Sequence, residues 1–229
     1  AEISPSQMKN LQNLAGYDIR ILDRTGIIID IFSVHAKTSE AKTQVSLAKL
    51  EYMLPRLTKQ WSHLERQMGG TGTRGGPGEQ QIEIDRRLIR RDINKLQKDL
   101  KKIQKTRLIQ NKNRSNAFQV SLVGYTNAGK STLMNLLTNA DVYVKNELFA
   151  TLDSTTRILD LNINRKALIS DTVGFIQKLP HELVASFRST LSNIKNSSLI
   201  LKVIDSNYTN INMHLSTIEE TIKEIDCKD

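Results

Sequence analysis

Residues 124–131 read Gly-Tyr-Thr-Asn-Ala-Gly-Lys-Ser and match the pattern G-x-x-x-x-G-K-[ST] without a mismatch. An apolar, strand-like run precedes them at 118–123, and a segment of helical character follows at 129–137. In this strand–loop–helix order, the loop amides and the positive end of the helix bind phosphate oxygens. The sequence therefore predicts an α/β domain built around a phosphate-binding loop (P-loop).

Two side chains of the P-loop are expected to have chemical roles. Lys130 should bridge the β- and γ-phosphates of a nucleoside triphosphate, and the hydroxyl of Ser131 should bind Mg²⁺. The loop recognises phosphates, so it does not distinguish GTP from ATP. The other expected nucleotide contacts of this segment are Asn127, Ala128, Gly129 and Thr132.

A second motif, D-x-x-G, occupies residues 171–174 and follows an apolar run. Asp171, at a strand end, can hold Mg²⁺ through water, and the Gly174 amide can contact a γ-phosphate. Thr172 is a further expected nucleotide contact. Phe175 stands where some GTPases place a glutamine that orients the attacking water, so hydrolysis should need another group or be slow.

A threonine-bearing loop, Phe-Ala-Thr-Leu-Asp-Ser-Thr-Thr-Arg at 149–157, lies between these motifs. A mobile loop at this place is expected to be switch I, in which one threonine completes the Mg²⁺ shell only when the γ-phosphate is present. Thr151, Thr155 and Thr156 all qualify by chemistry. The alternative is a polar loop without a metal contact.

Residues 37–114 have the pattern of an antiparallel helical hairpin. Leucines and other apolar residues recur at alternating spacings of three and four over 47–68, and a similar face occupies 82–103. Pro55 should kink the first helix or start a second segment. Between the two faces, residues 69–78 contain six glycines and a proline and cannot continue a helix. This glycine-rich segment is the expected tip of the hairpin.

The second helix of the hairpin is strongly basic. Twelve basic residues lie within 86–114, in a chain whose net charge is +9. Such an excess favours a polyanionic partner, although a solvated lysine-rich face is the alternative. The expected contacts with nucleic acid are Arg74 in the tip and Arg86, Arg87, Arg90 and Arg91 in the helix.

These patterns divide the chain into three parts. Residues 1–36 are expected to form a partial α/β domain, with a strand over 17–22 and a strand or helix over 27–34. Residues 37–114 form the hairpin, and residues 115–229 form a P-loop domain with a mostly parallel sheet. Because the chain begins at Ala1 without an initiator methionine, we expect a fragment.

Composition excludes several classes of protein. No apolar run reaches the roughly 18–20 residues that a membrane helix needs, and the N-terminus has no signal-peptide pattern. The single cysteine, Cys227, excludes an internal disulfide and is typical of a reducing cytoplasm. The four histidines show no metal-ligand spacing. We expect a cytoplasmic monomer.

Four phrases resemble HflX, a family of GTPases in the Obg–HflX group: GGTGTRGGPGE at 69–79, GYTNAGKSTLMN at 124–135, FATLDSTTR at 149–157 and DTVGFIQKLPHELVASF at 171–187. The resemblance spans nearly the whole chain. It implies an enzyme that binds GTP and GDP with Mg²⁺, hydrolyses GTP, associates with the large ribosomal subunit, and splits or rescues stalled ribosomes. It also implies that the glycine-rich tip reaches ribosomal RNA near the peptidyl-transferase centre. Thr151 is then the expected switch I threonine, and Lys130, Thr151 and Gly174 are the expected catalytic residues.

The sequence also departs from the HflX pattern. The tip has one glycine more than the usual TRGPGE, and Ser154 replaces a proline, which should loosen switch I. No N-K-x-D guanine-specificity motif follows the P-loop, and Asn-Lys-Asn-Arg at 111–114 precedes it. We therefore expect an HflX chain truncated at both ends, with a P-loop domain incomplete at its C-terminal end. The alternatives are a non-hydrolysing module that binds ribosomal RNA through its basic hairpin, and an ATP-using P-loop enzyme.

Overall fold

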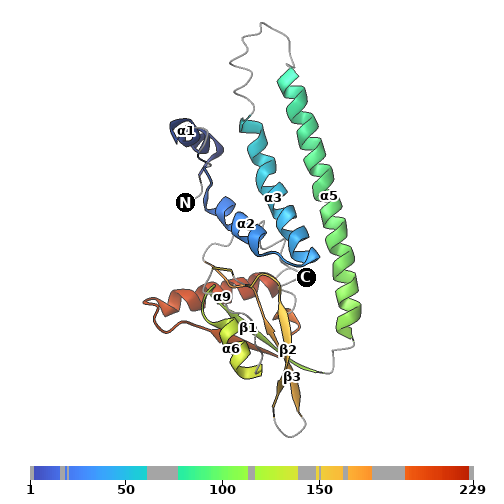
Figure 1. Ribbon diagram of the computed structural model, residues 1–229, viewed down its shortest axis with the longest axis vertical. Helices are drawn as coiled ribbons and strands as arrows, with labels where there is room; N and C mark the ends of the chain where they lie inside the picture. Colours follow the sequence, from blue (N-terminus) through green and yellow to red (C-terminus); the bar gives the residue numbers. More distant parts are fainter. Residues whose placement is uncertain are drawn as a thin grey trace.

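The computed structural model describes residues 3–15, 19, 21–60, 77–112, 117–138, 148–149, 151–161, 165–176 and 194–226. Helices from the first half of the chain form an elongated region, and strands with two helices from the second half form a compact one (Figure 1). The glycine-rich tip before residue 77, and with it Arg74, lies outside the described residues.

The N-terminal part is helical where it is described. Helix α1 covers Pro5–Ala15, and helix α2 covers Arg24–His35. The run 27–34, for which the sequence left strand and helix open, lies within α2. Asp23 caps this helix, because its carboxylate accepts a hydrogen bond from the Gly26 amide at 2.8 Å.

The strand expected over 17–22 is not formed at its described residues, which are Ile19, Ile21 and Leu22. The side-chain amide of Gln12 takes the place of a neighbouring strand. Its Nε2 donates to the carbonyl of Ile19, and its Oε1 accepts from the amide of Ile21 at 3.1 Å. The backbone here is therefore satisfied by a side chain of α1.

The helical hairpin is present as expected. Helix α3 (Ser39–Gln60) and helix α5 (Pro77–Lys112) pack side by side and antiparallel (Figure 1). Pro55 lies inside α3 rather than at the start of a second helix. The apolar faces meet as the spacing predicted, and the residues that form their joint core are Leu47, Leu50, Leu54, Ile89, Ile93, Leu96 and Leu100.

A four-stranded sheet forms the centre of the second half of the chain. Its strands are β1 (Phe118–Gly124), β2 (Thr155–Asp160), β3 (Lys166–Asp171) and β4 (Leu199–Val203), in the order β2-β3-β1-β4. Strand β1 is parallel to β3 and β4, whereas β2 is antiparallel to β3. The register sets Leu122 beside Asp171, which brings the end of β3 next to the P-loop.

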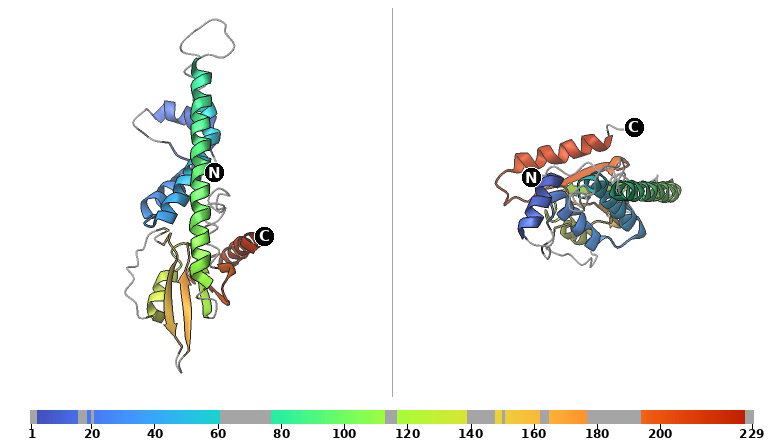
Figure 2. Two further views of the ribbon diagram at one scale, coloured as in Figure 1. Left: turned by 90° about the vertical axis from the view of Figure 1, so that its right-hand side faces the viewer. Right: turned by 90° about the horizontal axis from the view of Figure 1, so that it is seen from above.

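Helices α6 (Lys130–Thr138) and α9 (Ile211–Asp226) cover opposite sides of the sheet (Figure 2). Alternation along β1 explains this arrangement, because successive side chains of a strand point to opposite faces. Leu122 packs with Met134 of α6, whereas Val123 packs with Ile218 of α9. The helix expected within 181–194 lies almost wholly outside the described residues.

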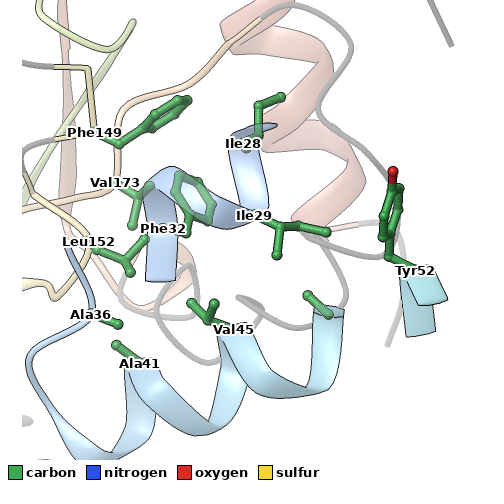
Figure 3. Packing of buried hydrophobic residues seen from close by; sticks show 11 residues of the cluster. Ile28, Ile29, Phe32, Ala36, Ala41, Val45, Tyr52, Phe149, Leu152 and Val173 are labelled. Atoms are coloured by element: carbon green, nitrogen blue, oxygen red, sulfur yellow. The ribbon is translucent and has the colours of Figure 1, made fainter. Parts of the chain in front are cut away.

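One hydrophobic core joins the two regions of the molecule (Figure 3). Phe32 of α2 contributes from the helical region, and Phe149, Leu152 and Val173 contribute from the sheet region. The rings of Phe32 and Phe149 meet edge to face, with their centroids 4.7 Å apart. The helices therefore pack directly on the two loops that carry the switch I and D-x-x-G motifs.

Candidate nucleotide-binding site

The P-loop turns sharply between β1 and α6. Gly129 has φ 87°, a left-handed conformation that glycine adopts without strain. Asn127 has φ 62°, which asparagine tolerates better than most residues. Gly124 packs against the next strand, since a β-carbon there would lie 2.2 Å from the carbonyl oxygen of Val203. The shape of the loop thus accounts for the two glycines of the P-loop motif, Gly124 and Gly129.

Lys130 is buried within this loop. Its Nζ donates to the carbonyl oxygens of Gly124 at 3.2 Å and Tyr125 at 2.8 Å. Burial lowers the pKa of Lys130 from 10.5 to about 8, while the charge of Asp171 acts in the opposite direction. An anion bound in the loop would stabilise the ammonium form and raise this pKa again.

Two hydroxyls and a carboxylate meet beside Lys130. The Oγ of Ser131 donates to Oδ2 of Asp171 at 2.5 Å and lies 3.0 Å from Oγ1 of Thr151. Burial raises the pKa of Asp171, and the hydrogen bond from Ser131 and the charge of Lys130 lower it in part. Its other oxygen, Oδ1, is buried and has no hydrogen-bond partner among the residues that the structure describes.

These groups fit a magnesium ion. Hydroxyl and carboxylate oxygens are the ligands that Mg²⁺ prefers, and a water held by the cation would satisfy the buried Oδ1 of Asp171, which is costly to leave unpaired. Across the described ranges, no group of three histidine, cysteine, aspartate or glutamate side chains could hold a metal ion. Because it combines two hydroxyls with a carboxylate, the cluster of Ser131, Thr151 and Asp171 is the candidate metal centre.

The structure separates the three candidate threonines of switch I. Thr151 lies beside Ser131. Thr156 pairs instead with the Ser170 hydroxyl at 2.9 Å, within the ladder between β2 and β3. Thr155 is the first residue of β2. Its backbone pairs with that of Asp171. Among the three threonines, the one whose hydroxyl lies against the Ser131 hydroxyl is Thr151.

The D-x-x-G segment is fastened to the P-loop. The amide of Thr126 donates to the carbonyl of Phe175, and the amide of Phe175 donates to the carbonyl of Gly124, both at 2.9 Å. A β-carbon on Gly174 would lie 2.5 Å from Cα of Thr126. Phe175 is buried and packs with Val123 and Ile218.

The other expected nucleotide contacts differ in exposure. Asn127, Gly129 and Thr132 are exposed, and Ala128 is half-buried, all at the start of α6 or in the loop before it. Thr172 is fully buried, and its hydroxyl donates to the carbonyl of Leu122 at 2.6 Å. The side chain of Thr172 thus belongs to the sheet rather than to a phosphate site, because its hydroxyl already has a partner.

Sequence reasoning missed two sets of contacts around the P-loop. The ring of Tyr125 stacks on His214 of α9 with centroids 3.7 Å apart, and Tyr208 lies against the same imidazole at 4.0 Å. The hydroxyl of Thr126 accepts a hydrogen bond from the Phe149 amide at 2.7 Å. No local pattern signals the pairs Tyr125–His214 and Thr126–Phe149, since their members are far apart in the chain.

The chain is similar to known proteins over nearly its whole length. Three family models match the chain: "GTP-binding GTPase N-terminal" over 1–33, "GTP-binding GTPase Middle Region" over 35–114 and "50S ribosome-binding GTPase" over 119–228. The GTPase HflX of Magnetococcus marinus is 47% identical over 226 residues, which are 98% of this chain and 52% of the relative. The GTPase HflX of Escherichia coli is 46% identical with the same coverage.

The chain belongs to the HflX family. It spans about half the length of the curated HflX relatives that it matches. Among solved structures, the SsGBP and GDP complex has a TM-score of 0.52 and 30% sequence identity, over 98% of this chain and 60% of that one. That likeness agrees with the predicted P-loop fold preceded by helices.

In this HflX-family chain, the four arginines of α5 that are expected to contact RNA do not share one face. Arg87, Arg90 and Arg91 are exposed on α5, in a surface hollow whose other lining residues are Asn94, Lys95, Lys98, Asp99 and Lys102. Arg86 is half-buried, and its Nε has no hydrogen-bond partner. Its position falls on the apolar face because it lies seven residues, close to two full turns, before the buried Ile93 on a helix of 3.6 residues per turn.

Within the described part of the chain, no helix is both long and apolar enough to cross a bilayer.

Proposed function

We propose that this chain binds GTP and GDP with Mg²⁺ and hydrolyses GTP slowly. The observation that carries the proposal is the cluster of Ser131, Thr151 and Asp171, with an unpaired carboxylate oxygen, beside the buried amine of Lys130. The relatives named GTPase HflX and the neighbouring structure described as a GDP complex support guanine as the base.

The residues of the site would divide the work among binding, orientation and charge. Lys130 would exchange its two carbonyl partners for β- and γ-phosphate oxygens, and the amides at the start of α6 would bind phosphate oxygens. Ser131 and Thr151 would bind Mg²⁺ directly, and Asp171 through water. The ion supplies positive charge that offsets the charge developing on the phosphates. The Gly174 amide would contact the γ-phosphate.

Slow hydrolysis follows from Phe175. Its side chain has no polar atom and is buried, so this position cannot orient an attacking water. Rapid hydrolysis would then need a group from a partner. The large ribosomal subunit and its RNA are the partner we propose, with a role in splitting or rescuing ribosomes. The exposed arginines of α5 and the family description "50S ribosome-binding GTPase" support it.

A titration with fluorescent GDP and, separately, fluorescent ADP tests the nucleotide proposal, with Lys130→Ala as the control. We expect GDP binding that depends on Lys130 and weak ADP binding. Equal binding of the two nucleotides would indicate a phosphate site without base specificity. Normal GDP binding by Lys130→Ala would contradict the proposed site.

A second candidate is a non-hydrolysing module that binds ribosomal RNA. The exposed Arg87, Arg90 and Arg91 favour this candidate, because binding of RNA through these side chains needs no nucleotide. It predicts co-sedimentation with large ribosomal subunits that weakens steeply as salt rises, because each phosphate contact releases counterions. The absence of nucleotide binding together with such co-sedimentation would favour this candidate over the GTPase.

A further inference from the structure

Residues 149–153 of switch I touch the helical region at three points. The ring of Phe149 meets Phe32 of α2 edge to face, and Leu152 is buried in the core that the two regions share (Figure 3). Asp153 provides the third contact, at the N-terminal end of α3. A segment assigned to the nucleotide site therefore has much of its support in helices that precede the P-loop in the chain.

The Asp153 contact is built from polar groups with specific geometry. Its Oδ2 accepts from the amides of Lys37 at 3.3 Å and Thr38 at 3.2 Å, and its Oδ1 accepts from the Thr38 hydroxyl. The same hydroxyl accepts from the Ala41 amide at 3.1 Å and so caps α3. A carboxylate at this end of a helix is further stabilised by the helix dipole.

The other end of the segment is held by the P-loop. The amide of Phe149 donates to the hydroxyl of Thr126 at 2.7 Å. Phe149 has φ 57°, which is strained for a residue with a bulky side chain and persists only where its surroundings impose it. Between these two anchors, Thr151 lies 3.0 Å from the Ser131 hydroxyl.

We propose that Thr38 and Phe32 of the helical region are positioning residues for Thr151. They fix Asp153 and Phe149, the residues on either side of it, and so hold the Thr151 hydroxyl at the metal cluster before nucleotide binds. This inference rests on the proposed GTP site. A switch I threonine contributes to binding of a triphosphate and not of a diphosphate. Loss of the anchors should therefore lower the affinity for the triphosphate selectively.

The inference couples the start of the hairpin to the γ-phosphate. Any partner that moves the beginning of α3 away from Asp153 would release Thr151 and lower the affinity for the triphosphate. By thermodynamic reciprocity, a bound triphosphate would favour the arrangement in which α3 stays on Asp153. The ligand that reports on this coupling is a nucleoside triphosphate with Mg²⁺, with the diphosphate as its reference.

The test compares Thr38→Val with Thr43→Val in the 229-residue chain. Both variants remove one hydroxyl from α3 or its cap, but the Thr43 hydroxyl bonds only to the Ser39 carbonyl of its own helix. Affinities for a non-hydrolysable GTP analogue and for GDP are measured with Mg²⁺. Loss of the Thr38 bond should lower the affinity for the analogue about tenfold and the affinity for GDP by less than about twofold. Thr38→Ser keeps the hydroxyl and should restore the affinity for the analogue.

A double-mutant cycle shows whether Thr38 acts through Asp153. In an Asp153→Ala background, Thr38→Val should have little further effect on the affinity ratio, because the shared contact is already lost. Additive effects of the two changes would overturn the assigned route. A second readout, amide hydrogen exchange of residues 148–153 without nucleotide, should become faster in Thr38→Val and stay unchanged in Thr43→Val.

Each outcome decides the inference. Equal triphosphate-to-diphosphate ratios in Thr38→Val and Thr43→Val would overturn it, as would an equal loss of both nucleotides in Thr38→Val. If the unaltered chain binds neither nucleotide, the proposed GTP site fails. Hydrogen exchange then decides alone whether Thr38 holds residues 148–153, and unchanged exchange in Thr38→Val would reject that role.

Discussion

Gly174 and Thr126 are in such close contact that a β-carbon on the glycine would fall 2.5 Å from Cα of the threonine and 2.8 Å from its nitrogen. Both atoms belong to backbone, so no side-chain rotation relieves the clash. The contact ties the D-x-x-G segment to the P-loop, together with the hydrogen bond from Thr126 to the Phe175 carbonyl.

Gly174→Ala should therefore destabilise the chain and weaken GDP binding together. Forcing a methyl group into this contact should cost about 1–3 kcal/mol of unfolding free energy. Urea unfolding and a fluorescent GDP titration measure the two effects. Unchanged values of both in Gly174→Ala would show that the two segments can separate without consequence.

Lys130 predicts a pH dependence of nucleotide binding. The pKa of Lys130 is about 8 in the folded chain without nucleotide and 10.5 when unfolded. Phosphates need the protonated amine, so GDP affinity should fall about tenfold per pH unit well above pH 8. Calorimetry in two buffers of different ionisation enthalpy should detect proton uptake at pH 8.5, and Lys130→Arg should bind with no such uptake.

The same shift affects stability in a defined direction. Because the folded pKa of Lys130 lies below the unfolded value, the unfolded chain binds more protons between pH 8 and 10.5. Stability of the nucleotide-free chain should therefore gain from this group as pH rises through that window, and lose that gain as pH falls through 8. A Lys130→Met variant should lack this contribution in urea unfolding.

Asp171→Asn should distinguish the role of this residue in metal binding from its role in stability. Burial raises the pKa of the Asp171 carboxyl, so its contribution to stability is present at low pH and is lost as pH rises through the folded pKa. The neutral amide removes that loss. We expect Asp171→Asn to be at least as stable without ligand, but to gain no thermal stability when Mg²⁺ is added to its GDP complex. A normal Mg²⁺ response would exclude Asp171 from the metal site.

A buried ion pair in the helical region gives a test independent of nucleotide. Asp23 accepts from Arg56 and from the Tyr52 hydroxyl, each at 2.7 Å, and its carboxylate is fully buried. Burial raises the pKa of Tyr52, which keeps this hydroxyl a donor. Arg56→Met leaves the carboxylate without its cation and should cost about 3 kcal/mol in urea unfolding. Lys49→Met, an exposed change on the same helix, should cost little.

The arginines of α5 predict a difference in salt dependence. Arg90 is exposed in the basic hollow, whereas Arg86 lies on the apolar face. Arg90→Ala should lower the slope of log affinity against log salt for large ribosomal subunits by about one unit per lost phosphate contact. Arg86→Ala should leave that slope unchanged and lower stability instead. Equal slopes for the two variants would remove Arg90 from the RNA contacts.

Local patterns in the sequence were enough to predict the P-loop, the hairpin faces and the strand before the loop. Each depends on spacing within a short segment, such as the run from Leu47 to Leu54 on one face of α3. The strand over 17–22 is not formed at its described residues, where the side-chain amide of Gln12 on α1 bonds to the backbone of Ile19 and Ile21 instead.

Contacts between distant segments could not be read from spacing. The stack of Tyr125 on His214 and the bond between Thr38 and Asp153 join residues that carry no shared pattern. The antiparallel pairing of β2 was also outside the mostly parallel sheet that strand–helix alternation predicts, because the short connection between β2 and β3 leaves no room for a crossover helix.

The core shared by Phe32, Phe149, Leu152 and Val173 limits where the chain can be divided into parts that are expressed separately. A polypeptide that began at β1 would carry three of these side chains on its surface with no helix to cover them, and an exposed apolar patch of this kind promotes self-association. Expression of the P-loop domain alone should therefore yield aggregated material, whereas a boundary placed before α2 should keep it dispersed. In chimeric proteins made from homologous genes, a crossover inside 24–173 should be tolerated poorly, because both halves of this core must come from the same gene.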